Sequence, residues 1–402
     1  MKLVMALKVR NEEEVIETNL RYHAAQGVDA FIVIDNGSTD GTAEILRRYR
    51  DRGLVHLIEE PGEDVWALAH EWVTRMARIA ATELDADWVI HTDADEFWWP
   101  IEGSLRDALA SVPEAYDVVV APRTEFLPRP DGPGSFAERL TVREAASRLR
   151  PKVAHRAAAD VALRSGAHDV GLAGDAGDLA SSGQSAKAIM RVSGDELGGA
   201  AGRLVWAPRF PCRVLHFPVR SFEHYRRRVE TELFRGDPPT KGARLRLKGH
   251  WDAGTLPELY AEIALDDRRV ASGVAAGALV VDERFRDFLA RCPDPTAAPA
   301  GASAAVVQAG DVKREELEAD LAANELDAMQ TLARTQRTFL RRLERVQRQL
   351  GKRKAKLADK VGDGAGESEG KGGAGDAPAG RRPPCAVRRL RKGVGRALGR
   401  GP

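Results

Sequence analysis

An apolar segment that ends in closely spaced acids is the part of the sequence best suited to chemistry. Residues 88–97 read Trp-Val-Ile-His-Thr-Asp-Ala-Asp-Glu-Phe, and the run before Asp93 has the composition of a buried strand. Successive strand residues face opposite ways, so Asp93 and Asp95 would share one face at the strand's end. Their carboxylates suit a hard cation such as Mg²⁺ or Mn²⁺, which keeps positions open for phosphate oxygens. The alternative is a polar turn in which Asp93 caps a helix.

The elements that would position these acids alternate along the first hundred residues. Apolar runs predict strands over 3–9, 30–35 and 55–58 and a strand that ends at Asp93; helical patterns cover 11–26, 42–49 and 66–84. Such alternation predicts a parallel sheet with right-handed crossovers, and ligands of such sheets bind beyond the carboxyl ends of the strands. We therefore expect Asp35, which ends the second strand, to share one crevice with Asp93 and Asp95.

The pattern is less regular after residue 100. The sequence predicts a short helix over 105–109, a strand over 116–122, a last strand over 212–218, and a basic helix over 221–235 with Ser221 as its N-cap. Residues 171–202 are rich in Gly, Ser and Ala, which indicates a flexible loop or an insertion.

The C-terminal part divides by composition from a main domain over residues 1–292. Residues 293–311 are rich in Pro, Ala and Gly and read as a linker, and residues 312–360 read as a long helix. Heptad spacing over 329–350 predicts either a short coiled coil that could pair two copies or a solvated helix that packs on its own domain. Residues 361–402 form a basic tail that we expect to be disordered. Its cations could contact RNA, anionic lipid or an acidic partner, and the alternative is a tail that only increases solubility.

Overall composition excludes several classes of protein. The chain of 402 residues has a net charge of +1, but residues 351–402 carry 14 Lys and Arg against 5 Asp and Glu, so the body is mildly acidic. This disfavours nucleic acid as a partner of the whole chain. Three scattered cysteines, no signal peptide, and no apolar run approaching roughly 18 residues predict a cytoplasmic protein, with peripheral contact at the inner membrane face left open.

Three motifs carry a resemblance to a known family. The opening at residues 6–13, Ala-Leu-Lys-Val-Arg-Asn-Glu-Glu, and residues 33–42, Val-Ile-Asp-Asn-Gly-Ser-Thr-Asp-Gly-Thr, resemble family 2 glycosyltransferases. The Asp-x-Asp-Glu-Phe segment is similar to a bacterial branch of that superfamily. Leu-His-Phe-Pro at 215–218 and Ser-Phe-Glu-His-Tyr at 221–225 match the branch more loosely, so that the resemblance covers roughly residues 1–265.

The resemblance implies a GT-A fold, an α/β architecture with a Rossmann-like, mostly parallel sheet flanked by helices. It also implies a metal-dependent enzyme that transfers a hexosyl or related group from a UDP-, GDP- or dTDP-sugar to a glycan, lipid or small-molecule acceptor. Mg²⁺ or Mn²⁺ would act as a Lewis acid on the diphosphate of the leaving group.

The same resemblance suggests roles for particular residues. Asp95 would bind the metal, Asp93 the metal or the donor ribose, and His216 would be a third metal ligand unless it is a core histidine. The remaining donor-binding candidates are Leu7 and Val9 through their backbone, Asn11, Asp35, Lys152 and His168. Lys152 could pair with a phosphate, although a lone lysine is more often solvated.

The general base stays open at this stage. Transfer needs a group that takes the acceptor proton, and Glu96, Asp169 and Glu196 are the candidate carboxylates. Trp98 and Trp99 follow the acids and could stack on a sugar or belong to the core. The alternative to an enzyme is a non-catalytic protein of the same fold that recruits partners through its C-terminal helix and tail.

Overall fold

The computed structural model describes a central domain and leaves several segments outside. Described are residues 1–60, 65–114, 117–145, 148–164, 169–171, 190–191, 204–205, 211–234, 242–293 and 306–309. All of them belong to the first of two compact units, residues 1–333. The predicted helix over 312–360, its heptads over 329–350 and the tail over 361–402 lie outside the described residues, as does most of the segment 171–202.

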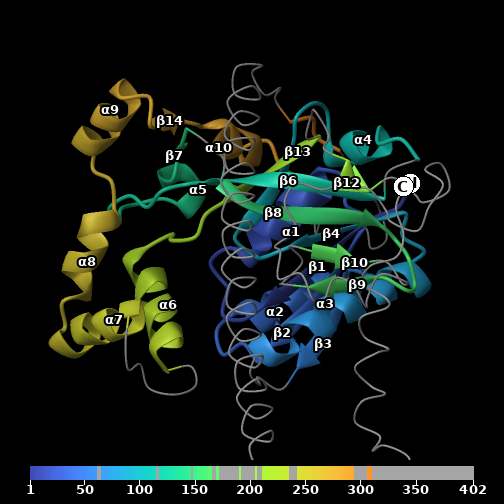
Figure 1. Ribbon diagram of the computed structural model, residues 1–402, viewed down its shortest axis with the longest axis horizontal. Coiled ribbons are helices and arrows are strands. Elements are labelled where there is room, and N and C mark those ends of the chain that lie inside the picture. The colour runs from blue at the N-terminus through green and yellow to red at the C-terminus, as the bar shows by residue number, and fades with distance from the viewer. Residues whose placement is uncertain are drawn as a thin grey trace, which may run out of the picture. The chain divides into compact units, whose positions relative to one another are not determined.

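An eight-stranded sheet forms the centre of the domain (Figure 1). Its strands lie in the order β3-β2-β1-β4-β8-β6-β13-β5. The bounds are β1 Leu3–Val9, β2 Ala30–Asn36, β3 Val55–Glu60, β4 Trp88–Thr92, β5 Glu96–Pro100, β6 Val118–Glu125, β8 Arg148–Arg156 and β13 Cys212–His216. β1 pairs in parallel with β2 and β4, β2 with β3, and β6 with β13, whereas β8 and β5 run antiparallel to their neighbours.

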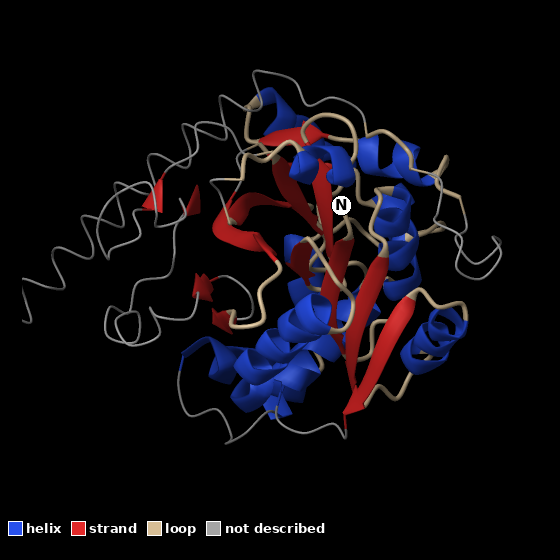
Figure 2. Cartoon of the chain, turned by 90° about the vertical axis from the view of Figure 1, so that its right-hand side faces the viewer, coloured by secondary structure: helices blue, strands red, loops and turns tan. Residues whose placement is uncertain are grey.

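Helices cover both faces of this sheet, as Figure 2 shows. The helices α1 (Ile16–Ala25) and α2 (Thr42–Asp51) pack on one face and α3 (Val65–Thr82) on the other. The alternate residues of β1 divide between the two cores: Leu3, Met5 and Leu7 face α1, and Val4 and Ala6 face α3. Burial on both faces explains why these strands are continuous apolar runs. The predicted α/β class with a mostly parallel sheet is confirmed.

The remaining elements are shorter. α4 (Leu105–Ala110) begins with a capping box in which Ser104 and Asp107 bond to each other's backbone. The other bounds are α5 Phe136–Arg139, β7 Val142–Glu144, β9 Ala162–Arg164, β10 Asp169–Gly171, β11 Met190–Arg191, β12 Leu204–Val205, α6 Phe222–Phe234, α7 Gly242–Ala253, α8 Leu256–Ile263, α9 Asp267–Ala275, β14 Leu279–Val281 and α10 Arg284–Leu289. Ser221 caps α6 as predicted, since its Oγ accepts from the amide of His224.

Two predicted elements differ from the structure, and two strands of the sheet were not predicted. The first helix begins at Ile16 rather than Asn11, because residues 11–15 form a turn that is bonded to the loop after β2. The strand expected over 116–122 runs from Val118 to Glu125, and its pairing with β8 shifts register between Ala121 and Arg123, where Pro122 has no amide hydrogen to donate. Neither β5 nor β8 was predicted.

Two further segments bear on the sequence interpretation. Trp98 and Trp99 lie in β5 with 0% and 1% exposure, so they belong to the core and offer no stacking surface to a sugar. Within the predicted linker, residues 306–309 are bonded to the domain: the amide of Val307 donates to Ala25 and that of Ala309 to Gly103. Among the described residues, no helix combines the length and apolar character needed to cross a membrane.

Candidate active site at the carboxyl edge of the sheet

The acidic residues of the Asp-x-Asp segment lie in a tight turn between β4 and β5. The amide of Glu96 donates to the carbonyl of Asp93 over 3.1 Å, and the Glu96 carboxylate accepts from the amide of Asp93 over 3.0 Å. The carbonyl of Asp95 accepts from the amide of Phe217, which follows β13. The turn is therefore fixed by its own side chain and by a strand that comes about 120 residues later in the chain.

Helix α1 holds the same turn from the core. The buried Asn19 amide donates to the carbonyls of Ala94 and Glu96 at 2.9 and 3.0 Å. One turn later, Nε2 of His23 accepts from the amide of Trp98, and Nδ1 donates to Asn19. Burial lowers the pKa of His23 to about 3, so this imidazole is neutral and can accept that bond.

Asp93 is paired with lysines. The Lys152 ammonium, on β8, lies 2.6 Å from Oδ2 of Asp93 and 2.9 Å from Oε2 of Glu96, and Lys8 lies 3.8 Å from Oδ1 of Asp93. Burial would raise the pKa of Asp93, but Lys152 and Lys8 outweigh it and hold the pKa at about 2. Lys152 is only 1% exposed. Its ammonium is thus engaged by two carboxylates, which leaves it poorly placed to bind a phosphate.

Asp95 faces a different set of cations. Nε2 of His216 lies 3.5 Å from Oδ2 of Asp95, and Nδ1 of the same ring lies 2.7 Å from Oε2 of Glu125. Burial would lower the pKa of His216, but these two carboxylates raise it to about 9. Burial would likewise raise the pKa of Asp95, yet His216 and Arg220 hold it well below its usual range. The structure therefore brings together Asp95 and His216, which sequence reasoning had grouped as metal ligands.

Arg220 connects this pair to the loop that follows β1. Its guanidinium is 1% exposed and lies 2.7 Å from Oε2 of Glu12 and 3.7 Å from Oδ2 of Asp95. Burial, opposed by Arg220, raises the pKa of Glu12 to about 7. A buried arginine between two acids fixes their separation, and removing it would leave both without this partner.

The loops that follow β1 and β2 are bonded to each other. Ser38 donates to Oδ1 of Asp35 over 2.5 Å and accepts from the amide of Asn11, whose own Oδ1 accepts from the amide of Thr39 over 2.8 Å. Asn11 has φ +56°, the left-handed region that Asn tolerates better than most residues. Because Val9 pairs with Asp35 in the sheet, the donor-binding candidates Leu7, Val9, Asn11 and Asp35 lie at one edge.

The structure describes the side chain of only one of the three candidates for the general base, Glu96. Glu96 is fully buried and lies near two cations, Lys152 and Arg123, so it is not placed to receive an acceptor proton. Asp169 lies in β10, where only the backbone is described. His168 and Glu196 fall outside the described residues.

Several site residues were not singled out from the sequence: Glu12, Arg123, Glu125 and Arg220. Arg123 and Glu125 end β6, which is parallel to β13, so they reach the same edge as His216. Recognition of the strand beyond Pro122 would have indicated them. Arg220 lies four residues after His216, and its partner Glu12 is more than 200 residues away, so no local pattern marks it.

The donor atoms at this edge fit a divalent cation only in part. No group of three or more His, Cys, Asp or Glu side chains that could hold a metal occurs among the described residues. Asp95 and His216 nonetheless offer two donors 3.5 Å apart. Two atoms that each lie about 2.1 Å from one ion are at most about 4.2 Å apart, so this pair fits two positions around Mg²⁺ or Mn²⁺. The other positions would belong to water or to a ligand.

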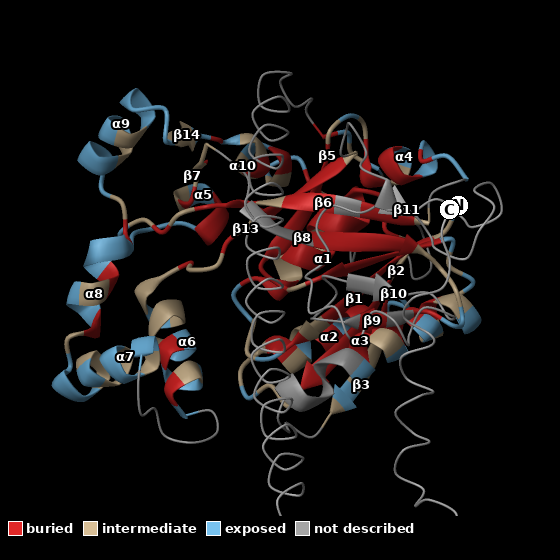
Figure 3. Ribbon diagram, in the orientation of Figure 1, coloured by how far each residue is buried: buried red, intermediate tan, exposed pale blue. Residues whose placement is uncertain are grey.

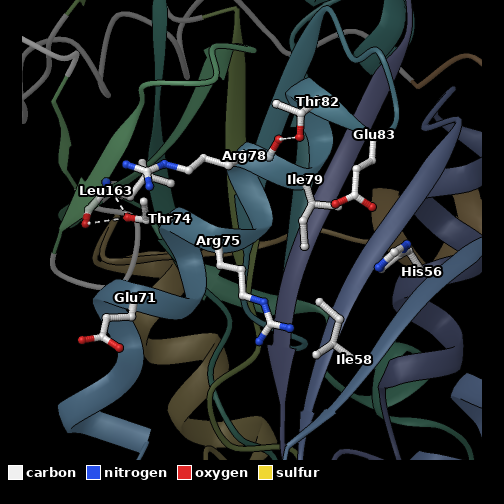
Figure 4. A pocket seen from close by; sticks show the side chains of 10 residues that line it. All are labelled: His56, Ile58, Glu71, Thr74, Arg75, Arg78, Ile79, Thr82, Glu83 and Leu163. Atoms are coloured by element: carbon white, nitrogen blue, oxygen red, sulfur yellow. Dashed lines mark hydrogen bonds between the residues drawn. The ribbon is translucent and has the colours of Figure 1, made fainter.

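A separate pocket opens beside α3, as Figure 4 shows, and it lies away from these acids. It has a volume of about 750 Å³ and is lined by His56 and Ile58 of β3 and by residues of α3. Its arginines have partners: Arg75 is paired with Glu60 at 2.7 Å, and Nε of Arg78 donates to the carbonyl of Val161. The cluster of charges at the carboxyl edge therefore remains the better candidate for chemistry.

Comparison with protein families identifies the N-terminal segment. Residues 6–131 match the family model described as Glycosyl transferase family 2. These residues run from within β1 to beyond β6 and include the Asp-x-Asp turn. The match confirms the resemblance stated from the motifs over these residues. A search of curated proteins gave no match.

Solved structures resemble the chain only in part. S. aureus TarS 1-349 in complex with UDP is 20% identical, with 39% of this chain and 47% of that chain covered and a TM-score of 0.28. Glucosyl-3-phosphoglycerate synthase from Mycobacterium tuberculosis, in complex with Mn²⁺, UDP and glucosyl-3-phosphoglycerate, is 24% identical, with 30% and 44% covered and a TM-score of 0.23. The chain thus spans less than half the length of these structures.

Proposed function

We propose that this protein transfers a sugar from a nucleotide-diphosphate-sugar donor to a hydroxyl group of a glycan, lipid or small-molecule acceptor, with Mg²⁺ or Mn²⁺ as cofactor. The observation that carries the proposal is the pairing of Asp95 with His216 at the carboxyl edge of a sheet whose first six strands overlap the segment that matches the family 2 glycosyltransferase model. The bound cation would supply Lewis-acid stabilisation of the diphosphate leaving group.

Residues of the chain would bind the cation and the donor. Asp95 and Nε2 of His216 would hold the cation, and Glu125 would orient the ring through Nδ1. Asp93, which accepts from Lys152 over 2.6 Å, would accept a hydrogen bond from a hydroxyl of the donor ribose. The Asn11–Ser38 loops would hold the nucleoside, with Asp35 beneath them. Transfer breaks the bond from the anomeric carbon to the β-phosphate oxygen, and the nucleoside diphosphate leaves with that bonding pair. The acceptor oxygen forms the new bond to the anomeric carbon, and its proton passes to a base.

The first test is binding of nucleotides. UDP, GDP, dTDP and CDP are each added with Mn²⁺ or with a chelator, and thermal unfolding is followed. A ligand that binds only the folded chain stabilises it by about 2.7 kcal/mol at one hundred times its dissociation constant. We expect one nucleotide to raise the melting temperature only when Mn²⁺ is present.

Matched variants test whether the shift in melting temperature arises from binding at the candidate site. Asp95→Asn should abolish the shift that depends on Mn²⁺, whereas Asp51→Asn, on the exposed surface of α2, should retain it. Transfer of a labelled sugar from the matching donor then tests the enzyme itself. If no nucleotide shifts the unfolding of the parent chain, the alternative of a non-catalytic assembly protein is favoured.

A further inference from the structure

Helices α6 and α7 differ in charge. Helix α6 contains three arginines and three glutamates, whereas α7 contains three Lys and Arg against one Asp, so the two helices together have a net charge of +2 although residues 1–350 as a whole are acidic. The two helices lie side by side in Figure 1. Near the start of α6, Arg227 lies 3.7 Å from Glu13, and the charge of Arg228 acts on Asp95 and Glu12. The cations of α7 instead pair with acids of α6 and α7 themselves.

This pair of helices has a small core of its own and leaves much of its surface uncovered. Val229, Leu233 and Leu256 form the buried cluster, with Leu247 and Trp251 packed against it. Helix α7 contains no buried residue (Figure 3). One face of α7 therefore packs on α6 and α8, and the rest of it is open to solvent.

Large apolar side chains are exposed where the two helices approach their connection. Phe234, the last residue of α6, is 62% exposed, and Leu245, in the first turn of α7, is 48% exposed. Phe234 packs edge-on against Trp251 with 5.6 Å between ring centroids. Arg244, Arg246 and Lys248 lie on the same helix as Leu245. We name this group of six residues the arm tip: Phe234, Arg244, Leu245, Arg246, Lys248 and Trp251.

We propose that the arm tip docks on a membrane surface that contains anionic lipids. Exposed apolar side chains among cations are the pattern of a segment that lies in the lipid interface: the aromatic and aliphatic groups enter the acyl boundary while the cations meet the headgroups. The ion pair of Lys248 with Asp252 at 2.7 Å involves partly exposed groups, so it is weak enough to exchange for a lipid phosphate. Arg244 donates to the carbonyls of Glu232 and Leu233, which keeps its charge at the end of α6 beside Phe234.

A nucleic acid would use the same cations but not the same apolar groups. Bases stack on aromatic rings, whereas the aliphatic Leu245 offers no such surface and gains most by leaving water. The arm tip therefore fits a lipid surface better than a single strand. Because α6 begins two residues after Arg220, docking would also fix the orientation of the candidate active site toward the membrane. The inference does not depend on the proposed transfer reaction.

The test uses a single added tryptophan as a local probe in the full chain, so that lipid contact at the arm tip can be distinguished from lipid contact by other segments. Phe234→Trp places a fluorophore at the arm tip, and Val274→Trp places one at an exposed apolar position of α9, which is 42% exposed. Vesicles contain phosphatidylcholine and phosphatidylglycerol with brominated acyl chains. We expect the brominated acyl chains to quench the fluorescence of the tryptophan added at position 234 but not of the one added at 274. Vesicles of phosphatidylcholine alone should quench neither.

A second pair of variants measures the contribution of the apolar groups. Combined Phe234→Ser and Leu245→Ser should weaken vesicle partitioning by about one hundred-fold, roughly ten-fold for each side chain removed from the interface. Val274→Ser with Val281→Ser, two exposed valines elsewhere, should leave it unchanged. Equal quenching at 234 and 274, or partitioning that is indifferent to the serine pair, would overturn the proposal. Quenching of the Phe234→Trp variant by a single-stranded oligonucleotide and not by vesicles would overturn it in favour of nucleic acid.

Discussion

The ammonium of Lys152 donates to Oδ2 of Asp93 over 2.6 Å and joins the acidic turn to the middle of the antiparallel strand β8. The same nitrogen lies 2.9 Å from Glu96. One buried cation therefore neutralises two of the three acids of the Asp-x-Asp-Glu segment, and Asp95 alone remains beside His216. The three carboxylates lie within four residues of one another in sequence, yet Asp93 and Glu96 share Lys152 whereas Asp95 faces His216 and Arg220.

Loss of Lys152 should destabilise the fold strongly. Lys152→Met leaves Glu96 buried without its nearest cation, and breaking a buried ion pair from one side costs about 3–5 kcal/mol. Lys8→Met is the matched control, because Lys8 is more exposed and lies 3.8 Å from Asp93; its expected cost is below about 1 kcal/mol. Urea unfolding measures both. Adding Glu96→Gln to Lys152→Met should recover part of the loss, and equal costs for the two lysines would contradict this account.

Glu125 should control the affinity of the site for a cation. Its carboxylate accepts from Nδ1 of His216 over 2.7 Å, and partners of this kind typically change metal affinity by about 10- to 100-fold. We expect Glu125→Gln to weaken Mn²⁺ binding within that range in the presence of the nucleotide that binds, as measured by electron paramagnetic resonance of free Mn²⁺. Glu223→Gln, on the surface of α6, serves as the control. Unchanged affinity in Glu125→Gln would show that His216 is not a ligand.

Acid should destabilise the chain through its buried histidines. Burial lowers the pKa of His23 to about 3 and that of His155 to about 4, whereas an unfolded histidine has a pKa near 6.5. Below pH 6.5 the unfolded state therefore binds protons that the folded state does not, so the free energy of unfolding falls as pH falls. Each such histidine contributes about 1.4 kcal/mol per pH unit well below pH 6.5 and above its folded pKa.

The variant His23→Gln isolates one of these protons. Glutamine can still donate and accept hydrogen bonds but does not titrate. Urea unfolding at several values between pH 7.5 and pH 4.5 should show a shallower decline in the variant than in the parent, by about one proton at the acidic end. Parallel declines in the two proteins would mean that His23 is protonated in the folded state.

Glycine at position 11 should destabilise the fold less than alanine. Asn11→Gly keeps the positive φ without strain and loses the bonds that the amide and the hydroxyl of Thr39 donate to Oδ1. Asn11→Ala loses the same two bonds, and the left-handed conformation costs it about 1–2 kcal/mol more. We therefore expect the alanine variant to be the less stable of the two by at least about 1 kcal/mol in urea unfolding. The reverse order would show that this turn rearranges freely.

Local patterns in the sequence were sufficient for the first four strands and for the position of the acids. Continuous apolar runs identified β1, β2 and β4, because both faces of these strands are buried. Asp35, Asp93 and Asp95 could be assigned to one edge since parallel strands end together. The strands and the acids that follow them are defined by residues close together in the chain, so one sequence is enough to predict them.

Strands that contain charged residues could not be recognised from apolar runs. The charged and polar residues of β8, Lys152 and His155 among them, interrupt any apolar run, and the acids that neutralise Lys152 are more than 50 residues away in sequence. Arg220 and Glu125 are likewise defined by distant partners. The start of the first helix was wrong for a related reason, because Ser38 and Thr42 bond the residues that would have formed its first turn. Such outcomes depend on tertiary contacts that override local propensity.

The position of β8 between β4 and β6 has a consequence for synthesis on the ribosome. The segment over residues 6–131 that matches the family model contains β4 and β6, but these strands meet only through β8, which ends at Arg156, and β6 gains its other neighbour only with β13. A nascent chain that has emerged only as far as residue 131 therefore exposes unpaired edges on both strands and lacks Lys152. The growing protein must avoid edge-to-edge association during that interval, and its acidic turn acquires Lys152, His216 and Arg220 only after the later strands have emerged.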